Sequence, residues 1–163
     1  EEMDDSRNVL IESARISRGK IEDIAGITSK DLDALIFPGG FGVAKNLSDY
    51  AMAGVECSVN PDVLRLSREV HNDGKPIGVI CIAPTIMAKI LAGETELTIG
   101  FDEQIASDID AMGAKHMLCP VDEIIVDKGK KIVSTPAYME ANSIKEAAYG
   151  IEKLVAEILT MVK

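Results

Sequence analysis

The sequence is poor in the residue types that would encode several common kinds of functional site. It holds two histidines and three cysteines, and no Cys-x-x-Cys pair occurs among them. This pattern argues against a locally encoded zinc site or a dithiol redox centre. We therefore expect no metal and no cofactor. The odd number and wide separation of the cysteines favour a reduced, intracellular protein.

Basic residues, aromatic residues and long apolar runs are also scarce. Seventeen Lys and Arg residues against 27 Asp and Glu residues give a net charge of -10, and aromatic residues make up 4% of the chain. Surfaces that bind nucleic acid are basic, so we expect no nucleic-acid partner. The longest apolar runs have only the length of a strand, so we expect no membrane-spanning segment and no membrane partner.

No targeting signal is visible at the start of the chain. The sequence opens on Glu1-Glu2-Met3-Asp4, without a basic segment followed by an apolar one and without a lipidation motif. We therefore expect a cytoplasmic location. Because the first residue is not an initiator methionine, a leading piece that carried a targeting segment could precede it.

What the sequence does contain is a regular alternation of apolar runs and helical patterns. The chain has 163 residues, 47% of them apolar, which suits one domain over residues 1–163. Alternation of strands and helices predicts an α/β fold with a mostly parallel sheet covered by helices on both faces. The expected strands are 34–37, 76–80, 97–99, 116–118, 124–126 and 131–135. The expected helices are 6–18, one from Asn60 to near Gly74, 84–91, 102–112, and one from Ser143 onward.

The last helix has the clearest pattern. Ser143 and Glu146 have the spacing of a capping box, in which each residue satisfies a backbone N–H of the other. Eight apolar positions recur at helical spacing and predict the buried face: Ile144, Ala147, Ala148, Ile151, Leu154, Val155, Ile158 and Leu159.

Ligands bind at the carboxyl ends of the strands in such sheets, and two of the predicted strands end in unusual sequences. One ends in VICIAP, where Cys81 lies between an apolar strand and a helix that begins near Pro84. A residue on so sharp a turn presents its side chain at the edge of the sheet, as in a nucleophile elbow. The positive end of the following helix favours an anion such as a thiolate, the reactive form of cysteine.

The other unusual strand end is Pro38-Gly39-Gly40. Glycine lets backbone N–H groups turn toward an anion, so Gly39 and Gly40 are candidate oxyanion donors together with Ile82 N–H. The two pieces complement each other only if the fold brings the two strand ends together. A free buried cysteine more often packs than reacts, so the residues alone leave both roles open for Cys81.

Four segments together resemble a known superfamily. They are IFPGGFGVAKNL at 36–47, PIGVICIAP at 76–84, RNVLIESARISRG at 7–19 and STPAYM at 134–139. The chain resembles the class I glutamine amidotransferase-like superfamily over essentially its whole length. Within it, the chain is similar to the PfpI and protein-deglycase branch, and more closely to the ElbB group, once linked to isoprenoid biosynthesis.

That resemblance implies a flavodoxin-like three-layer sandwich and a homodimer. It implies that Cys81 is the elbow nucleophile and that Gly40 and Ile82 donate to the oxyanion. It also implies a cofactor-free activity of the glyoxalase or deglycase type on small reactive aldehydes. Lys45 and Asn46 follow the glycine loop and are candidates to line the pocket, although ordinary helix-start polarity explains them equally. The resemblance adds Thr135 and Tyr138 as further candidates at its border.

The sequence departs from the superfamily at several places. Members of the PfpI branch often have a histidine directly after the cysteine, where this chain has Ile82, and other deglycase-like members have one soon after the next strand, where this chain has Gly100-Phe101. Members usually open with a strand and a helix that carries a glutamate in contact with the cysteine, and this chain has no such segment before Arg7. Glu12 belongs to a different motif. Amidotransferases also need a histidine late in the chain in a His-x-Glu arrangement, and neither His71 nor His116 matches it. No general base is therefore assigned.

Three functions remain open at this point. The first is a cysteine-dependent enzyme that converts glyoxal or methylglyoxal through a hemithioacetal at Cys81. The second is a non-catalytic redox sensor or binding protein in which the same cysteine is oxidised reversibly. The third is a glutaminase-like subunit, which the absent histidine makes the weakest of the three.

Overall fold

The computed structural model describes residues 7–162. Four strands form one sheet: β1 (Leu35–Phe37), β2 (Ile77–Ile80), β5 (Ile125–Asp127) and β6 (Ile132–Thr135). Two more, β3 (Glu96–Leu97) and β4 (Lys115–His116), pair with each other. The α-helices are α1 (Val9–Ile16), α2 (Tyr50–Ala53), α3 (Pro61–Asn72), α4 (Ala83–Leu91), α5 (Glu103–Ala111) and α6 (Ile144–Met161). Shorter helical turns are η1 (Ile24–Gly26), η2 (Ser29–Asp31), the π-helix η3 (Val43–Leu47), η4 (Gly54–Glu56) and η5 (Ala137–Met139).

The four-stranded sheet has the order β1-β2-β6-β5. β1, β2 and β6 run parallel, and β5 joins antiparallel as the other half of a hairpin with β6. Within residues 7–162, β1 has a neighbouring strand on one side only. The predicted α/β fold with a mostly parallel sheet is confirmed.

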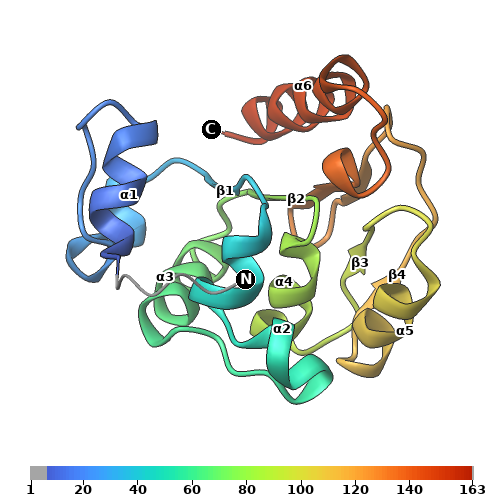
Figure 1. Ribbon diagram of the computed structural model, residues 1–163, viewed down its shortest axis with the longest axis horizontal. Helices are drawn as coiled ribbons and strands as arrows, with labels where there is room; N and C mark the ends of the chain where they lie inside the picture. Colours follow the sequence, from blue (N-terminus) through green and yellow to red (C-terminus); the bar gives the residue numbers. More distant parts are fainter. Residues whose placement is uncertain (1–6, 163) are drawn as a thin grey trace.

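Helices cover both faces of this sheet, which makes three layers (Figure 1). α6 lies over one face, and α3 and α4 lie over the other. The central strands β2 and β6 are buried along their whole length, because helices cover them on both sides. Among the described residues, no helix is both long and apolar enough to cross a bilayer.

The small β3-β4 sheet stands beside β6 and runs in the same direction. Glu96 N–H donates to the Asp127 carboxylate at 3.2 Å, near the start of β6, and Thr98 N–H donates to Ser134 Oγ at 3.0 Å, near its end. The strand predicted over 97–99 is therefore shorter than expected. Since Thr98 N–H bonds to a side chain, it does not extend a backbone ladder.

The last helix differs from its prediction at its start. Ser143 Oγ accepts from Glu146 N–H at 3.2 Å, as a cap should. The Glu146 carboxylate, however, accepts from Asn142 N–H at 2.8 Å, one residue earlier than a capping box requires. The predicted N-cap at Ser143 is therefore confirmed. The predicted return contact, from Ser143 N–H to the Glu146 side chain, is wrong.

The buried face of α6 is also narrower than the apolar pattern predicts. The sheet covers only one stripe of the helix, which includes Ala147, Leu154 and Ile158. Three residues of the predicted face are exposed instead: Ile144, Val155 and Leu159. A wide apolar stripe in the sequence therefore overestimates the part of a helix that one sheet can bury.

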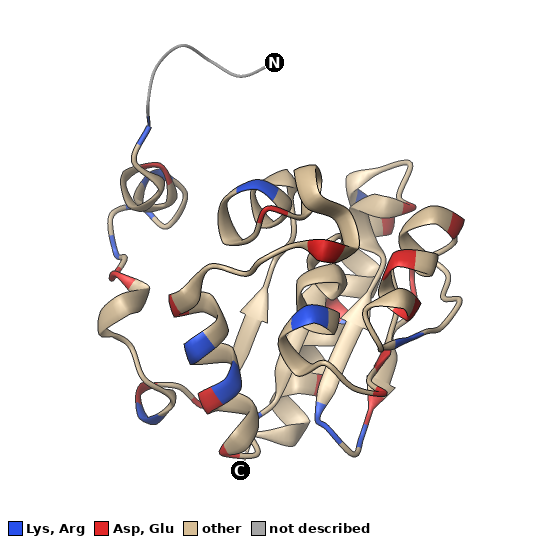
Figure 2. Cartoon of the chain, turned by 90° about the horizontal axis from the view of Figure 1, so that it is seen from below, with Lys and Arg blue, Asp and Glu red and all other residues tan. Residues whose placement is uncertain are grey.

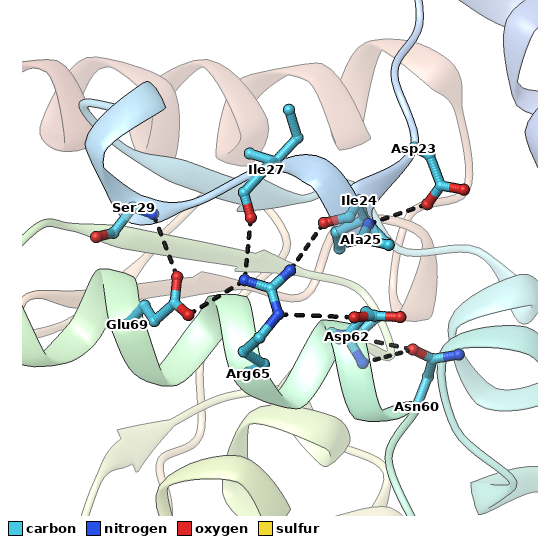
Figure 3. A network of polar contacts seen from close by, with 10 residues as sticks. Asp23, Ile24, Ala25, Ile27, Ser29, Asn60, Asp62, Arg65 and Glu69 are labelled. Atoms are coloured by element: carbon cyan, nitrogen blue, oxygen red, sulfur yellow. Dashed lines mark hydrogen bonds and ion pairs between the residues drawn. The ribbon is translucent and has the colours of Figure 1, made fainter.

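Arg65 fixes the irregular segment that leads into β1 (Figure 3). Its guanidinium donates to the carbonyl oxygens of Ile24 at 2.9 Å and Ile27 at 3.0 Å. Asp62 and Glu69, on the same face of α3, form ion pairs with it at 3.6 and 3.1 Å and hold the guanidinium in place. One side chain of α3 thus donates to two carbonyls of this segment, one of which, that of Ile24, also accepts from Ile27 N–H at 3.1 Å.

Candidate active site

The carboxyl ends of β1 and β2 meet at one point. Phe37 pairs with Val79 in the last register position of the two strands. Two residues further along each chain, Gly39 lies against Cys81, and a Cβ built at Gly39 would stand 2.7 Å from both the Cys81 Cβ and the Ile80 carbonyl oxygen. Gly39 also has a φ of +83°. No side chain fits there, so the condition for a joint site at these two strand ends is met.

Cys81 occupies the sharp turn between β2 and α4. It has a φ of +62°, a left-handed conformation that is uncommon and strained for a residue other than glycine. Cys81 N–H donates to the Thr135 carbonyl at 3.0 Å, so the next strand of the sheet holds the turn. The residue is only 7% exposed. Such strain persists where the surrounding structure imposes it, which is typical of an elbow nucleophile.

The backbone around the cysteine offers two N–H groups. In the described part of the chain, neither Gly40 N–H nor Ile82 N–H forms a hydrogen bond within the protein. Gly40 has a φ of +83°, and a Cβ built on it would meet nothing within 4 Å, so the space beside it is open. Ile82 precedes the nine-residue helix α4, whose positive end lies next to Cys81. This arrangement suits an anion that forms beside the sulfur.

The two residues after the glycine loop that were predicted to line the pocket, Lys45 and Asn46, have different surroundings. Lys45 Nζ stands 5.2 Å from the centre of the Phe41 ring, in a cation–π contact, and both residues are exposed. Asn46 lines a separate cavity of about 380 Å³ between α1 and α3, together with Leu10 and Asn60.

The two predicted residues after β6 differ as well. Thr135 reaches Cys81 through its backbone carbonyl, while its hydroxyl donates to the Glu123 carbonyl at 2.8 Å. Tyr138 lies in η5 and is 60% exposed.

Sequence reasoning missed Glu140. Its carboxylate accepts from Phe101 N–H at 2.7 Å and packs on Gly100, so it joins the segment after β3 to the segment after β6. The two partners are 39 residues apart in the chain, and no local pattern could have revealed the contact.

Neither histidine is placed as a base. His116 Nε2 accepts from Ile99 N–H at 3.3 Å, and burial lowers the pKa of the imidazole. His71 Nδ1 is buried without a hydrogen bond near the end of α3. Within residues 7–162, no group of three His, Cys, Asp or Glu side chains is placed to hold a metal ion.

The other two cysteines are buried and lie outside the elbow. Burial raises the pKa of the Cys57 thiol, and it raises the pKa of the Cys119 thiol to about 11. Both therefore stay protonated near neutral pH and behave as small apolar side chains.

Comparison with known proteins places the chain in a family. It is 46% identical over 166 residues to the human "glutamine amidotransferase-like class 1 domain-containing protein 3, mitochondrial"; the match covers 96% of this chain and 62% of that protein. The chain thus spans about three fifths of the length of this relative. No family model matches the sequence.

Solved structures agree with this placement. An isoprenoid biosynthesis protein with an amidotransferase-like domain from Ehrlichia chaffeensis superposes with a TM-score of 0.91 at 35% identity, over all of this chain and 75% of that one. DJ-1β of Drosophila melanogaster has the same fold, with a TM-score of 0.54 at 20% identity over 85% of this chain and 66% of that one.

The expectation of a cytoplasmic location is contradicted. The human relative is named a mitochondrial protein, as are the ES1 relatives of Rattus norvegicus and Danio rerio. The error has a simple cause, because location was inferred from the absence of a signal in these 163 residues alone. In sequence and in structure alike, this chain belongs to the family of proteins with an amidotransferase-like domain.

Proposed function

We propose that the protein is a mitochondrial, cofactor-free enzyme that converts α-oxoaldehydes to α-hydroxy acids through a covalent adduct at Cys81. It would form part of the ElbB group, within the PfpI and deglycase branch. The observation that carries the proposal is the contact between Gly39 and Cys81, which puts a strained cysteine next to two unpaired N–H groups. Covalent catalysis needs this combination of a nucleophile and donors to the developing oxyanion.

The first step is attack by the Cys81 thiolate on the aldehyde carbon. A carbon–sulfur bond forms, the carbonyl π bond breaks, and its electron pair moves to the oxygen. Gly40 N–H and Ile82 N–H stabilise this oxyanion, which takes up a proton to give a hemithioacetal.

The remaining steps rearrange the adduct without any outside oxidant or reductant. The proton on the former aldehyde carbon leaves, and the neighbouring ketone oxygen becomes a hydroxyl in an enediol. A proton then adds to the neighbouring carbon while the hydroxyl on the sulfur-bearing carbon loses its proton and becomes a carbonyl, which gives a thioester of an α-hydroxy acid. Water then cleaves the thioester and restores the thiol, so methylglyoxal and one water give lactate.

The test is turnover of methylglyoxal to lactate by the wild-type protein and by Cys81→Ala, with Cys57→Ala as the matched control for loss of a buried thiol. The expected result is full activity in Cys57→Ala and a loss of at least about 100-fold in Cys81→Ala, because no other group can form the adduct. Equal rates in wild type and Cys81→Ala contradict the proposal.

A second function, reversible redox sensing at Cys81, is favoured by one observation. In residues 7–162, no side chain forms a hydrogen bond with the Cys81 sulfur, so no partner there acts as its base. The same N–H groups that suit an oxyanion would also hold an oxidised sulfur. Mass spectrometry after mild peroxide treatment tests this alternative, which requires Cys81 to be oxidised before Cys57 and Cys119.

A further inference from the structure

Exposed aromatic side chains follow three of the strands, β1, β3 and β6. Phe41, Phe101 and Tyr138 are 68%, 51% and 60% exposed. Phe41 comes four residues after β1, Phe101 four residues after β3, and Tyr138 three residues after β6. Of the six aromatic residues in the chain, the only other exposed one is Tyr149 on α6. Three of the four exposed rings in the chain thus follow the ends of strands, two of them in the four-stranded sheet and one in the small β3-β4 sheet beside it.

Contacts between the three loops bring them to the same place. The loop of Phe41 begins at Gly39, which touches Cys81. The loop of Tyr138 begins at Thr135, whose carbonyl accepts from Cys81 N–H. The loop of Phe101 is tied to the loop of Tyr138, because Phe101 N–H donates to Glu140. Two of the rings therefore belong to loops that contact the turn of Cys81, and the third belongs to a loop that is tied to one of these through Glu140.

The position of Phe41 is supported further by its neighbour. Lys45 lies over the Phe41 ring at 5.2 Å, one helical turn further on. Gly40, which adjoins Phe41, leaves open space where a side chain would lie. The open space beside Gly40 therefore adjoins the residue that carries an exposed aromatic ring.

From this arrangement we infer that the site is selective for α-oxoaldehydes that carry an aromatic or bulky apolar substituent. The inference rests on the function proposed above and specifies its substrate. While the aldehyde carbon is bound to Cys81, a substituent the size of a phenyl ring extends toward the exposed aromatic side chains and stacks on them. The methyl group of methylglyoxal is too small to make such contacts, so it gains little from the rings.

The experiment compares phenylglyoxal, measured as mandelate, with methylglyoxal, measured as lactate. Both are assayed with wild type and with Phe41→Ala, Phe101→Ala, Tyr138→Ala and the triple variant. The matched control is Tyr149→Ala, which removes an exposed ring that also has a lysine beside it, Lys145 at 5.9 Å, but lies on α6. Thermal unfolding of each variant confirms that it is folded.

The expected result is a higher kcat/KM for phenylglyoxal than for methylglyoxal in the wild type. The triple variant should lose about tenfold in kcat/KM for phenylglyoxal and less than about twofold for methylglyoxal, because ring contacts of this size are worth about one order of magnitude. Tyr149→Ala should leave both values unchanged.

The outcomes separate the two proposals. Cys81-dependent turnover with equal or greater preference for methylglyoxal overturns the inference and leaves the proposed function standing. An equal loss for both aldehydes in the triple variant, or no loss for either, overturns it too. If the wild type converts neither aldehyde, the proposed function fails, and the substrate selectivity fails with it.

Discussion

Gly39 and Cys81 touch across the ends of two neighbouring parallel strands. The position that a Cβ of residue 39 would occupy lies 2.7 Å from the Cβ of Cys81, closer than two such atoms approach in folded proteins. Residue 39 must therefore be a glycine, because any side chain there would overlap Cys81. This contact joins the two halves of the candidate active site and makes each dependent on the other.

The first prediction concerns this contact. Gly39→Ala should lower the free energy of unfolding by about 3 kcal/mol, from left-handed strain plus overlap with Cys81. Gly40→Ala is the matched control, because Gly40 has the same φ of +83° but open space around it. It should cost only about 1 kcal/mol, since strain alone remains. Urea unfolding measures the free energy of unfolding of both variants. Equal losses in the two would show that overlap with Cys81 does not destabilise the protein.

The second prediction concerns the three cysteines. Iodoacetamide at neutral pH should modify Cys81 before Cys57 or Cys119 in the native protein. Burial raises the pKa of the Cys57 and Cys119 thiols, so they offer little thiolate for the reaction. Peptide mapping by mass spectrometry reads the order, and denatured protein, in which all three react, serves as the control. Faster labelling of Cys57 or Cys119 would contradict the assignment.

The third prediction concerns the segment that leads into β1. Arg65→Ala removes the donors to Ile24 and Ile27 and should lower the free energy of unfolding by about 2 kcal/mol. Hydrogen exchange should rise in residues 24–32 before it rises elsewhere. Arg15→Ala, which breaks an exposed ion pair of 3.7 Å with Glu12, should cost less than about 0.5 kcal/mol. The hypothesis fails if the two variants behave alike.

The fourth prediction concerns pH. Burial lowers the pKa of His116 in the folded protein below its ordinary value of 6.5. The unfolded chain then binds a proton more readily than the folded one, so this group lowers stability as the pH falls below about 6.5. His116→Gln should reduce that loss between pH 7.5 and 5.5, because glutamine does not titrate. An NMR titration that places the pKa of His116 above 6.5 would refute the assignment.

Local patterns in the sequence predicted much of the fold. The Asn60-Pro61 pair marked the start of α3, and Asn60 does accept from the N–H groups of Asp62 and Val63. The apolar runs before Pro38 and Cys81 became the parallel strands β1 and β2. The motifs at their ends showed which edge of the sheet to inspect, because parallel strands bring their carboxyl ends to a common edge.

Contacts between distant residues could not be predicted in the same way. Arg65 and Ile24 are 41 residues apart, and Glu140 and Phe101 are 39 apart, so neither pair leaves a periodic signal. Thr98 leaves its strand because a side chain of β6, Ser134, takes its N–H. The sequence also could not show how Thr135 meets the cysteine, which it does through its backbone carbonyl, while its hydroxyl bonds to Glu123.

The most direct test of the account is to trap the covalent adduct. Wild-type protein and Cys81→Ala are mixed with phenylglyoxal, quenched with acid within one turnover, and digested for peptide mapping. The account predicts an acid-stable thioester on the peptide that holds Cys81, which decays as mandelate appears, and no such adduct in Cys81→Ala. Mandelate formed at the wild-type rate without any adduct on Cys81, or an adduct on Cys57 or Cys119 instead, would contradict it.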